Sequence, residues 1–336
     1  ISLSTAPVAG ATYAWTGPDG FTSALQNPTI PSATTAKAGT YSVTVTVNGC
    51  TSAAGTTSVV VNPKPATPTP SNGGPYCEGA TIALSTPAVS VATYAWTGPD
   101  NFTSALRNPT ISGATAANAG TYSVTVTVNG CTSVAGTTAV VVNPIPAAPT
   151  ASNGGPYCEG ATISLSTPSV TGATYAWTGP DGFTSALRSP TIASATMAKA
   201  GTYSVTITIN GCTSAAGTTT VVVNPAPATP TASNGGPYCE GATIALSTAT
   251  VAGATNAWPG PDGVMSALQN PTIASATTAK AGTYAVTVTV DGCTSAAGMT
   301  TVVVNPIPAA PTASNGGPYC EGATIALSTP AVSGAT

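Results

Sequence analysis

The sequence predicts an all-β protein, a tandem array of β-sandwiches built on an 81-residue repeat. Tryptophans stand at positions 15, 96, 177 and 258, each 81 residues after the last. Segments such as Thr121–Val128 (TYSVTVTV) alternate apolar and hydroxyl residues with a period of two, which is typical of half-buried strands. No segment keeps the 3.6-residue period of a helix over ten residues. Short strands with turn signals between them indicate a sandwich.

The repeat at 63–143 shows the elements in order. Pro63–Pro70 is proline-rich, and prolines fix φ and withhold a donor, so this run predicts an extended, semi-rigid connector. Thr81–Ser85 alternates with period two and predicts a strand. Tyr94–Trp96 predicts a second strand with both aromatic rings on one face. Gly98–Asn101 then carries the residues of a turn.

The clearest strand is Thr121–Val128, in which valines share one face with a tyrosine and hydroxyl residues share the other. Asn129-Gly130 follows and predicts a tight hairpin, because both turn positions need a positive φ. We expect the next strand to end in Ala139–Val142.

The period predicts four repeats and the start of a fifth. The chain begins and ends inside a repeat, because Ile1–Thr12 recurs with few changes as Ile325–Thr336. We therefore expect the sequence to be a window cut from a longer repetitive polypeptide. The expected domains are a truncated first repeat at 1–62, complete repeats at 63–143, 144–224 and 225–305, and a truncated fifth at 306–336.

The composition excludes several functions. Only 4% of residues are charged, against roughly 25% in an ordinary globular chain. Six Lys and Arg stand against nine Asp and Glu, so no basic surface exists to bind nucleic acid. Histidine, the commonest general base and metal ligand, is absent. We expect no enzyme, no cofactor, no metal site and no membrane-spanning segment.

Two features resemble an immunoglobulin-like domain. Asn118–Tyr122 (NAGTY) is similar to the approach to strand F, where a tyrosine folds back in a tyrosine corner, and Trp96 stands where the strand C tryptophan belongs. The repeat as a whole resembles the Ig-like and PKD-like repeats of large secreted adhesins from bacteria of the Bacteroidetes type. The resemblance implies an Ig-like sandwich array in a cell-surface or extracellular stalk. The core residues expected in the four repeats are Trp15, Trp96, Trp177, Trp258, Tyr41, Tyr122, Tyr203 and Tyr284.

One departure from that family concerns the core disulfide. Where antibody domains place the second core cysteine, two residues after the tyrosine, this chain has Val43, Val124, Val205 and Val286. Leu84, twelve residues before Trp96, stands about where the other core cysteine would be. We expect aliphatic packing around Trp96 in place of that disulfide.

The cysteines follow the same period elsewhere in the repeat. Eight cysteines at regular spacing, with neither histidine nor a C-x-x-C pair, indicate disulfides and an oxidising compartment. We favour pairing within each repeat, which closes local loops and leaves Cys50 and Cys320 to pair outside the window. The favoured pairs are Cys77–Cys131, Cys158–Cys212 and Cys239–Cys293.

A second pairing stays open. Strands B and F of an Ig sandwich run in the same direction, and the two cysteines of a repeat then fall near opposite ends. In that register, pairing between consecutive domains fits better, as Cys77–Cys212 and Cys158–Cys293.

Other candidate sites have simpler readings. The periodic acids, such as Asp100 and Glu78, could be calcium ligands, but two acids per repeat are too few for a cation that takes six to eight oxygens. We interpret them as a turn former and a solvated side chain.

Tyr94 and Trp96 could stack on a sugar, but a central strand favours a core role for Trp96. The fourth repeat has Asn256 and Val264 in place of a tyrosine and a phenylalanine, and we interpret this as drift.

The sequence thus favours a structural repeat segment of an extracellular filament or a cell-surface adhesin stalk. Its partners would be copies of itself, because surfaces with little net charge lack the repulsion that keeps proteins apart. The alternatives are an adhesin module that binds surface glycans or a protein, and accessory repeats of a larger secreted enzyme.

Overall fold

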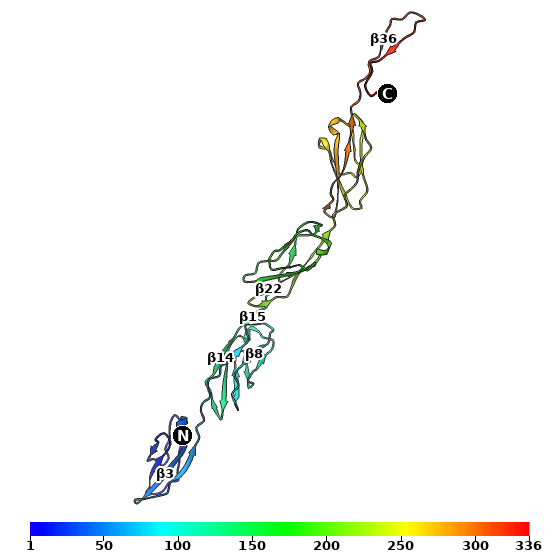
Figure 1. Ribbon diagram of the computed structural model, residues 1–336. Coiled ribbons are helices and arrows are strands. Elements are labelled where there is room, and N and C mark those ends of the chain that lie inside the picture. The colour runs from blue at the N-terminus through cyan, green and yellow to red at the C-terminus, as the bar shows by residue number, and fades with distance from the viewer. Residues whose placement is uncertain (336) are drawn as a thin grey trace. The chain divides into compact units, whose positions relative to one another are not determined.

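The computed structural model describes residues 1–335 and confirms the all-β fold class. Those residues form β-strands and a few 3₁₀ turns, with no α-helix among them. Their contacts divide the chain into two units. One comprises Ile1–Ala147 with Thr208–Ser214, and the other comprises Ala148–Ile207 with the residues from Ala215 onward. Each repeat is a separate group of strands, as Figure 1 shows for the repeat that contains β8 and β14.

The first unit holds two repeats. The first repeat consists of β1 (Thr12–Thr16), β2 (Thr22–Ser23), η1 (Thr35–Lys37), β3 (Gly39–Val47), β4 (Cys50–Thr51) and β5 (Gly55–Val59). The second consists of β6 (Ser71–Asn72), β7 (Tyr76–Cys77), β8 (Ile82–Ser85), β9 (Thr93–Thr97), β10 (Thr103–Ser104), β11 (Thr110–Ile111), η2 (Ala116–Asn118), β12 (Gly120–Val128), β13 (Cys131–Thr132), β14 (Gly136–Val140) and β15 (Val142–Asn143).

The second repeat is a two-sheet sandwich. One sheet has the order β10-β9-β12-β13, with β14 also paired to β12, and the other has the order β11-β8-β6. Its core lies between the sheets and contains Ile82 and Leu84 from β8, Trp96 from β9, and Tyr122 and Val124 from β12. Leu84, Trp96 and Val124 are each at most 1% exposed, so aliphatic side chains enclose the indole where an antibody domain has its disulfide.

The second unit contains most of the third repeat and the fourth repeat, while the hairpin of the third repeat at Thr208–Ser214 belongs to the first unit. The elements of the third repeat are β16 (Ser152–Asn153), β17 (Tyr157–Cys158), β18 (Ile163–Ser166), β19 (Thr174–Thr178), β20 (Thr184–Ser185), β21 (Thr191–Ile192), η3 (Met197–Lys199), β22 (Gly201–Ile209), β23 (Cys212–Thr213), β24 (Gly217–Val221) and β25 (Val223–Asn224). In the fourth they are β26 (Ala232–Asn234), β27 (Tyr238–Cys239), β28 (Ile244–Thr248), β29 (Thr255–Pro259), η4 (Pro261–Gly263), β30 (Met265–Ser266), β31 (Thr272–Ile273), η5 (Thr278–Lys280), β32 (Gly282–Val290), β33 (Cys293–Thr294), β34 (Gly298–Val302) and β35 (Val304–Asn305). Beyond these lie β36 (Ser314–Asn315) and β37 (Leu327–Ser328).

The last strand of a repeat changes partner along its length. β14 pairs antiparallel with β12 up to Val140, which lies opposite Gly120, the first residue of β12. Since β12 begins there, the chain beyond Val140 has no residue of that strand to pair with. After Val141 it continues as β15, which pairs in parallel with β7. The single strand expected to end in Ala139–Val142 is therefore two short strands.

The hairpin turn after β12 has the expected geometry. Asn129 and Gly130 both have positive φ, 48° and 75°, as the Asn-Gly pair predicts. Val128 lies opposite Cys131 across the turn. The hairpin therefore places Cys131 beside the last residue of β12.

The proline-rich run packs against the repeat that follows it. The carbonyl oxygen of Pro68 lies so close to Gly136 in β14 that a Cβ at Gly136 would collide with it. A few residues further on, the Asn72 side chain donates hydrogen bonds to the Thr138 hydroxyl and the Ala139 carbonyl oxygen, both at 2.9 Å. The second half of the run is thus an attached edge of the sandwich, while its first residues form the connector.

Candidate functional site

Two disulfides link consecutive repeats. Cys77 of the second repeat is bonded to Cys212 of the third, and Cys158 of the third is bonded to Cys293 of the fourth. Each pair spans 135 residues of sequence, with Cα–Cα distances of 5.6 and 5.5 Å. We call these two bonds the junction disulfides, and they are the most distinctive chemical feature of the chain.

Backbone pairing holds Cys158 in place. β17, which carries Cys158, pairs in parallel with β25 at the end of the same repeat. The Glu159 amide donates to the Asn224 carbonyl oxygen at 2.9 Å. Tyr157 anchors the other side, because its hydroxyl oxygen accepts from the Gly154 amide at 2.8 Å and donates to the Ser164 carbonyl oxygen at 2.9 Å. The tyrosine beside this cysteine therefore serves its own repeat.

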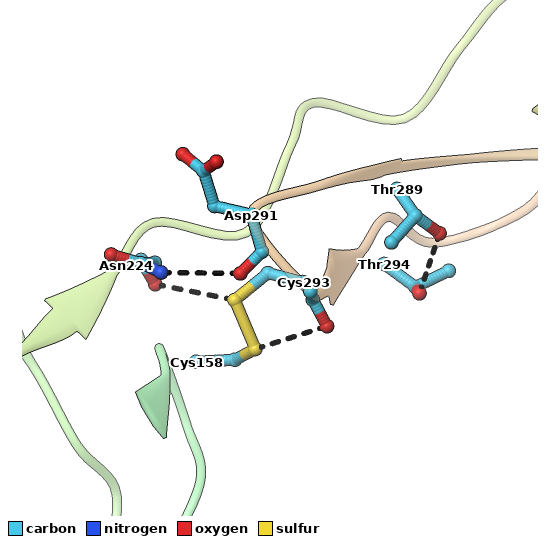
Figure 2. Close-up of a disulfide and its surroundings, with 7 residues drawn as sticks. Cys158, Asn224, Thr289, Asp291, Cys293 and Thr294 are labelled. Carbon is cyan, nitrogen blue, oxygen red and sulfur yellow. Dashed lines mark hydrogen bonds between the residues drawn. A yellow bond between two sulfur atoms is a disulfide. The ribbon is translucent and has the colours of Figure 1, made fainter. Parts of the chain in front are cut away.

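A hairpin presents the partner cysteine. Asp291 and Gly292 form the turn with φ values of 49° and 79°, and Cys293 follows directly, opposite Val290. Figure 2 shows Asn224 beside the turn, facing both Asp291 and the sulfur of Cys293. Its side-chain amide donates to the Asp291 carbonyl oxygen at 3.2 Å, and its own carbonyl oxygen lies 3.9 Å from the Cys293 Sγ. Asn224 thus joins the end of one repeat to the hairpin of the next.

The same asparagine contact recurs at the other junctions. Asn143 donates to the Asn210 carbonyl oxygen at 3.2 Å beside Cys212, and Asn62 donates to the Asn129 carbonyl oxygen at 3.1 Å beside Cys131. Sequence reasoning missed these asparagines. The signal was present, since each is the Asn of a Val-Asn-Pro that ends a repeat.

Burial separates the bonded hairpin cysteines from an unbonded one. Cys212 and Cys293 are each 1% exposed, whereas Cys50, at the same place in the first repeat, is exposed. The cysteines without a disulfide in the structure are Cys50, Cys131, Cys239 and Cys320. Cys77 and Cys158 are half-buried, so each junction disulfide has one sulfur that is shielded from reductants in solution, which suits a permanent link.

The favoured pairing within each repeat is wrong, because none of the pairs Cys77–Cys131, Cys158–Cys212 and Cys239–Cys293 forms. Cys77 lies opposite Asn143. Asn143 comes just after Val140, which pairs with Gly120, so Cys77 is near the first residue of β12. Cys131 follows Val128 at the other end of β12. That strand has nine residues, so its ends are about 26 Å apart at about 3.3 Å per residue, beyond the ~7 Å Cα limit for a disulfide. The pairing between consecutive repeats, kept open above, is the one formed.

The predicted aromatic residues lie in the cores. Exposure is 3%, 1%, 1% and 0% for Trp15, Trp96, Trp177 and Trp258, so none presents its face to a sugar. Exposure is 0% for Tyr41, Tyr122, Tyr203 and Tyr284.

Each buried tyrosine forms the corner that the resemblance implies. The Tyr122 hydroxyl donates to the Asn118 carbonyl oxygen at 2.9 Å, four residues back, and Tyr203 does the same with Lys199 at 2.9 Å. Burial, and next the negative charge of Asp100, raise the pKa of Tyr122 above its ordinary value.

The acidic residues do not gather. Asp100 occupies its turn with a φ of 55°, and the Glu78 amide pairs with the Asn143 carbonyl oxygen at the edge of β15. Within residues 1–335 no three Cys, Asp or Glu side chains form a group that could hold a metal ion. Nor does that part of the chain contain a helix long and apolar enough to cross a membrane.

Comparison with known proteins gives similarity to tandem immunoglobulin domains. No family model and no curated protein matches the chain. Among solved structures it is similar to Sidekick-1 immunoglobulin domains 1–5, with 14% identity over 94% of this chain and 76% of that one and a TM-score of 0.27. It is also similar to titin domains A168–A170, with 13% identity, 69% and 97% coverage and a TM-score of 0.30. It is similar as well to the three N-terminal domains of the bacteriophage RB49 highly immunogenic outer capsid protein, with 14% identity over 72% of this chain and 99% of that one and a TM-score of 0.31. Similarity at this level is no evidence of a shared ligand or partner.

Proposed function

We propose that this chain is a non-enzymatic structural segment, a row of Ig-like domains covalently linked into an extracellular stalk or filament. The observation that carries the proposal is the Cys158–Cys293 disulfide between consecutive repeats. A bond inside one domain would stabilise that domain alone. A bond between domains stabilises the array, which is useful where the array as a whole performs the structural function. We propose 63–143, 144–224 and 225–305 as its complete domains.

The chemistry of the cysteines supports an extracellular place. Disulfides persist in oxidising surroundings and are rare in the cytosol. The resemblance of the repeat to those of secreted Bacteroidetes-type adhesins fits the same location, at the bacterial cell surface.

The four unbonded cysteines fit the same register. A Cys in Tyr-Cys-Glu-Gly pairs with one 135 residues further on. For Cys239 and Cys320 that position lies after residue 336, and for Cys50 and Cys131 the corresponding position lies before residue 1. We propose that each pairs with a cysteine of a further repeat outside residues 1–336.

Association with copies of itself is part of the proposal. With 4% charged residues and a net charge of −3, little repulsion opposes contact between chains. Light scattering at rising concentration under oxidising conditions tests this, with free thiols alkylated so that no new disulfide forms. We expect a mass that grows with concentration, and a constant monomer mass would contradict self-association.

Trypsin offers a sharp test of the covalent array. The chain has cleavage sites after Lys37, Arg107, Arg188, Lys199 and Lys280, while Lys64 precedes a proline and resists cleavage. The large cysteine-bearing fragments are 38–107, 108–188, 200–280 and 281–336. The junction disulfides predict two separate linked pairs, 38–107 with 200–280 and 108–188 with 281–336.

The competing connectivity gives a different map. Pairing within repeats would join all four fragments into one product through 77–131, 158–212 and 239–293. Non-reducing mass spectrometry of alkylated protein distinguishes the two results. Two linked pairs in protein recovered from the outside of the producing cell would support the proposal, and one four-fragment product would contradict it.

A further inference from the structure

The junction disulfides overlap along the chain. Cys158, where the second bond begins, lies inside the loop that Cys77–Cys212 closes. Subtracting residue numbers gives 81 residues from Cys77 to Cys158, 54 from Cys158 to Cys212 and 81 from Cys212 to Cys293. Three stretches of backbone therefore connect one disulfide to the other.

We propose that this overlap makes the array an extension-limited tether, a mechanical role that rests on the structural function proposed above. In a plain tandem array, domains carry tension in series, and any one of them can unfold alone. Between the two junction disulfides the three stretches carry tension in parallel. All three span the same distance between the two disulfides, so none can lengthen unless the other two lengthen with it.

The disulfide connectivity sets the maximum extension between Cys77 and Cys293. Without disulfides, 216 residues separate Cys77 from Cys293, a length of about 740 Å at full extension. With both bonds the shortest covalent route runs from Cys77 to Cys212, back along the chain to Cys158, and across to Cys293. That route contains 54 residues, or about 190 Å. The other stretches stay slack at that limit.

The contacts around the bonds suit a load-bearing role. Cys293 is buried and its hairpin is hydrogen-bonded to Asn224, so the Cys293 end of the bond that carries the force is shielded from a soluble reductant. On the other side, Cys158 lies in a strand paired to β25. Each end of the bond is thus attached to a sheet.

Single-molecule stretching of the full chain, attached by its two ends through cysteine-free tags, tests the inference. Reduction should lengthen the fully extended chain by 162 residues, the difference between 216 and 54, or about 550 Å. Before reduction, the segment from Cys77 to Cys293 should give one combined unfolding event at higher force. After reduction it should give separate events.

Cysteine variants provide the controls. In Cys293→Ser one junction disulfide remains, and reduction should release 135 residues, about 460 Å. In Cys239→Ser the gain should stay at about 550 Å, because Cys239 is unbonded. Pairing within repeats would instead give 108 residues, about 370 Å, in both variants.

The outcomes separate the two proposals. If trypsin mapping shows the junction disulfides but the oxidised segment still unfolds in separate steps at the force of the reduced chain, the tether is refuted and the structural function stands. If mapping shows pairing within repeats, both are refuted. Junction disulfides together with one combined event at higher force support both.

Discussion

Cys158 and Cys293 are bonded across 135 residues, between strand β17 of one repeat and the hairpin of the next. Replacing Cys158 with Ser should therefore destabilise the chain over two repeats. A 135-residue loop is worth up to about 5 kcal/mol by the chain-entropy estimate. Hydrogen exchange measured at increasing urea concentrations should show that the third and fourth repeats open at lower urea than in the unaltered chain. Cys320→Ser is the matched control, since Cys320 is unbonded and exposed. An equal loss in both variants would contradict the prediction.

Asn224→Ala should expose one junction and spare the other. The variant removes the hydrogen bond to the Asp291 carbonyl oxygen, worth about 1 kcal/mol. We expect Cys158–Cys293 to be reduced faster by dithiothreitol while Cys77–Cys212, beside the intact Asn143, keeps its rate. Timed reduction followed by trypsin mapping reads both bonds in one sample. If Cys158–Cys293 is reduced at the same rate in Asn224→Ala as in the unaltered chain, Asn224 does not protect the bond.

Gly98→Ala should destabilise the second repeat. A Cβ at this position would collide with the ring of Tyr122, which is held by its hydrogen bond to Asn118. Overpacking of this kind costs about 1–3 kcal/mol. Gly73→Ala is the control, because its nearest neighbour, the Tyr76 hydroxyl, is at an ordinary 3.6 Å. Urea unfolding of both variants measures the difference, and equal midpoints would refute the collision.

Val264→Phe should stabilise the fourth repeat. In the third repeat Phe183 meets Tyr203 edge to face with ring centroids 5.5 Å apart, while the fourth repeat has Val264 near Tyr284. Such a pair contributes about 0.5–1.5 kcal/mol beyond its buried area. The reverse change, Phe183→Val, should weaken the third repeat. Local hydrogen exchange reports each repeat separately, and a shift in the opposite sense in either variant would contradict the prediction.

Alkaline pH should weaken the repeats through their corner tyrosines. Burial, followed by the nearby Asp100, Asp181 and Asp262, raises the pKa of Tyr122, Tyr203 and Tyr284 above 10. Because the folded pKa is the higher one, this contribution to stability is complete below pH 10 and is lost as pH rises through the folded pKa. Urea midpoints measured from pH 8 to 11 on alkylated protein should fall above pH 10. The second repeat of Tyr122→Phe should fall less, and an identical fall would assign the effect to other groups.

Much of each domain could be predicted because it depends on neighbours along the chain. The alternation in Thr121–Val128 defines a strand with one buried face, and Asn129-Gly130 defines the turn that follows it. The tyrosine corner joins residues only four apart, Tyr122 and Asn118. Short-range patterns of this kind indicate the same local structure in each of the four repeats.

The cysteine partners could not be chosen on the same grounds. Each complete repeat has two cysteines 54 residues apart, and the short loop that this pair would close makes local pairing attractive. The Ig register suggests that the two cysteines of a repeat lie near opposite ends, and the folded strand β12 decides it by placing Cys77 and Cys131 at its two ends. Composition and period thus indicate a β-sandwich array with disulfides. Which cysteines meet depends on where the strand ends lie in space, since a disulfide forms only between Cα atoms less than about 7 Å apart.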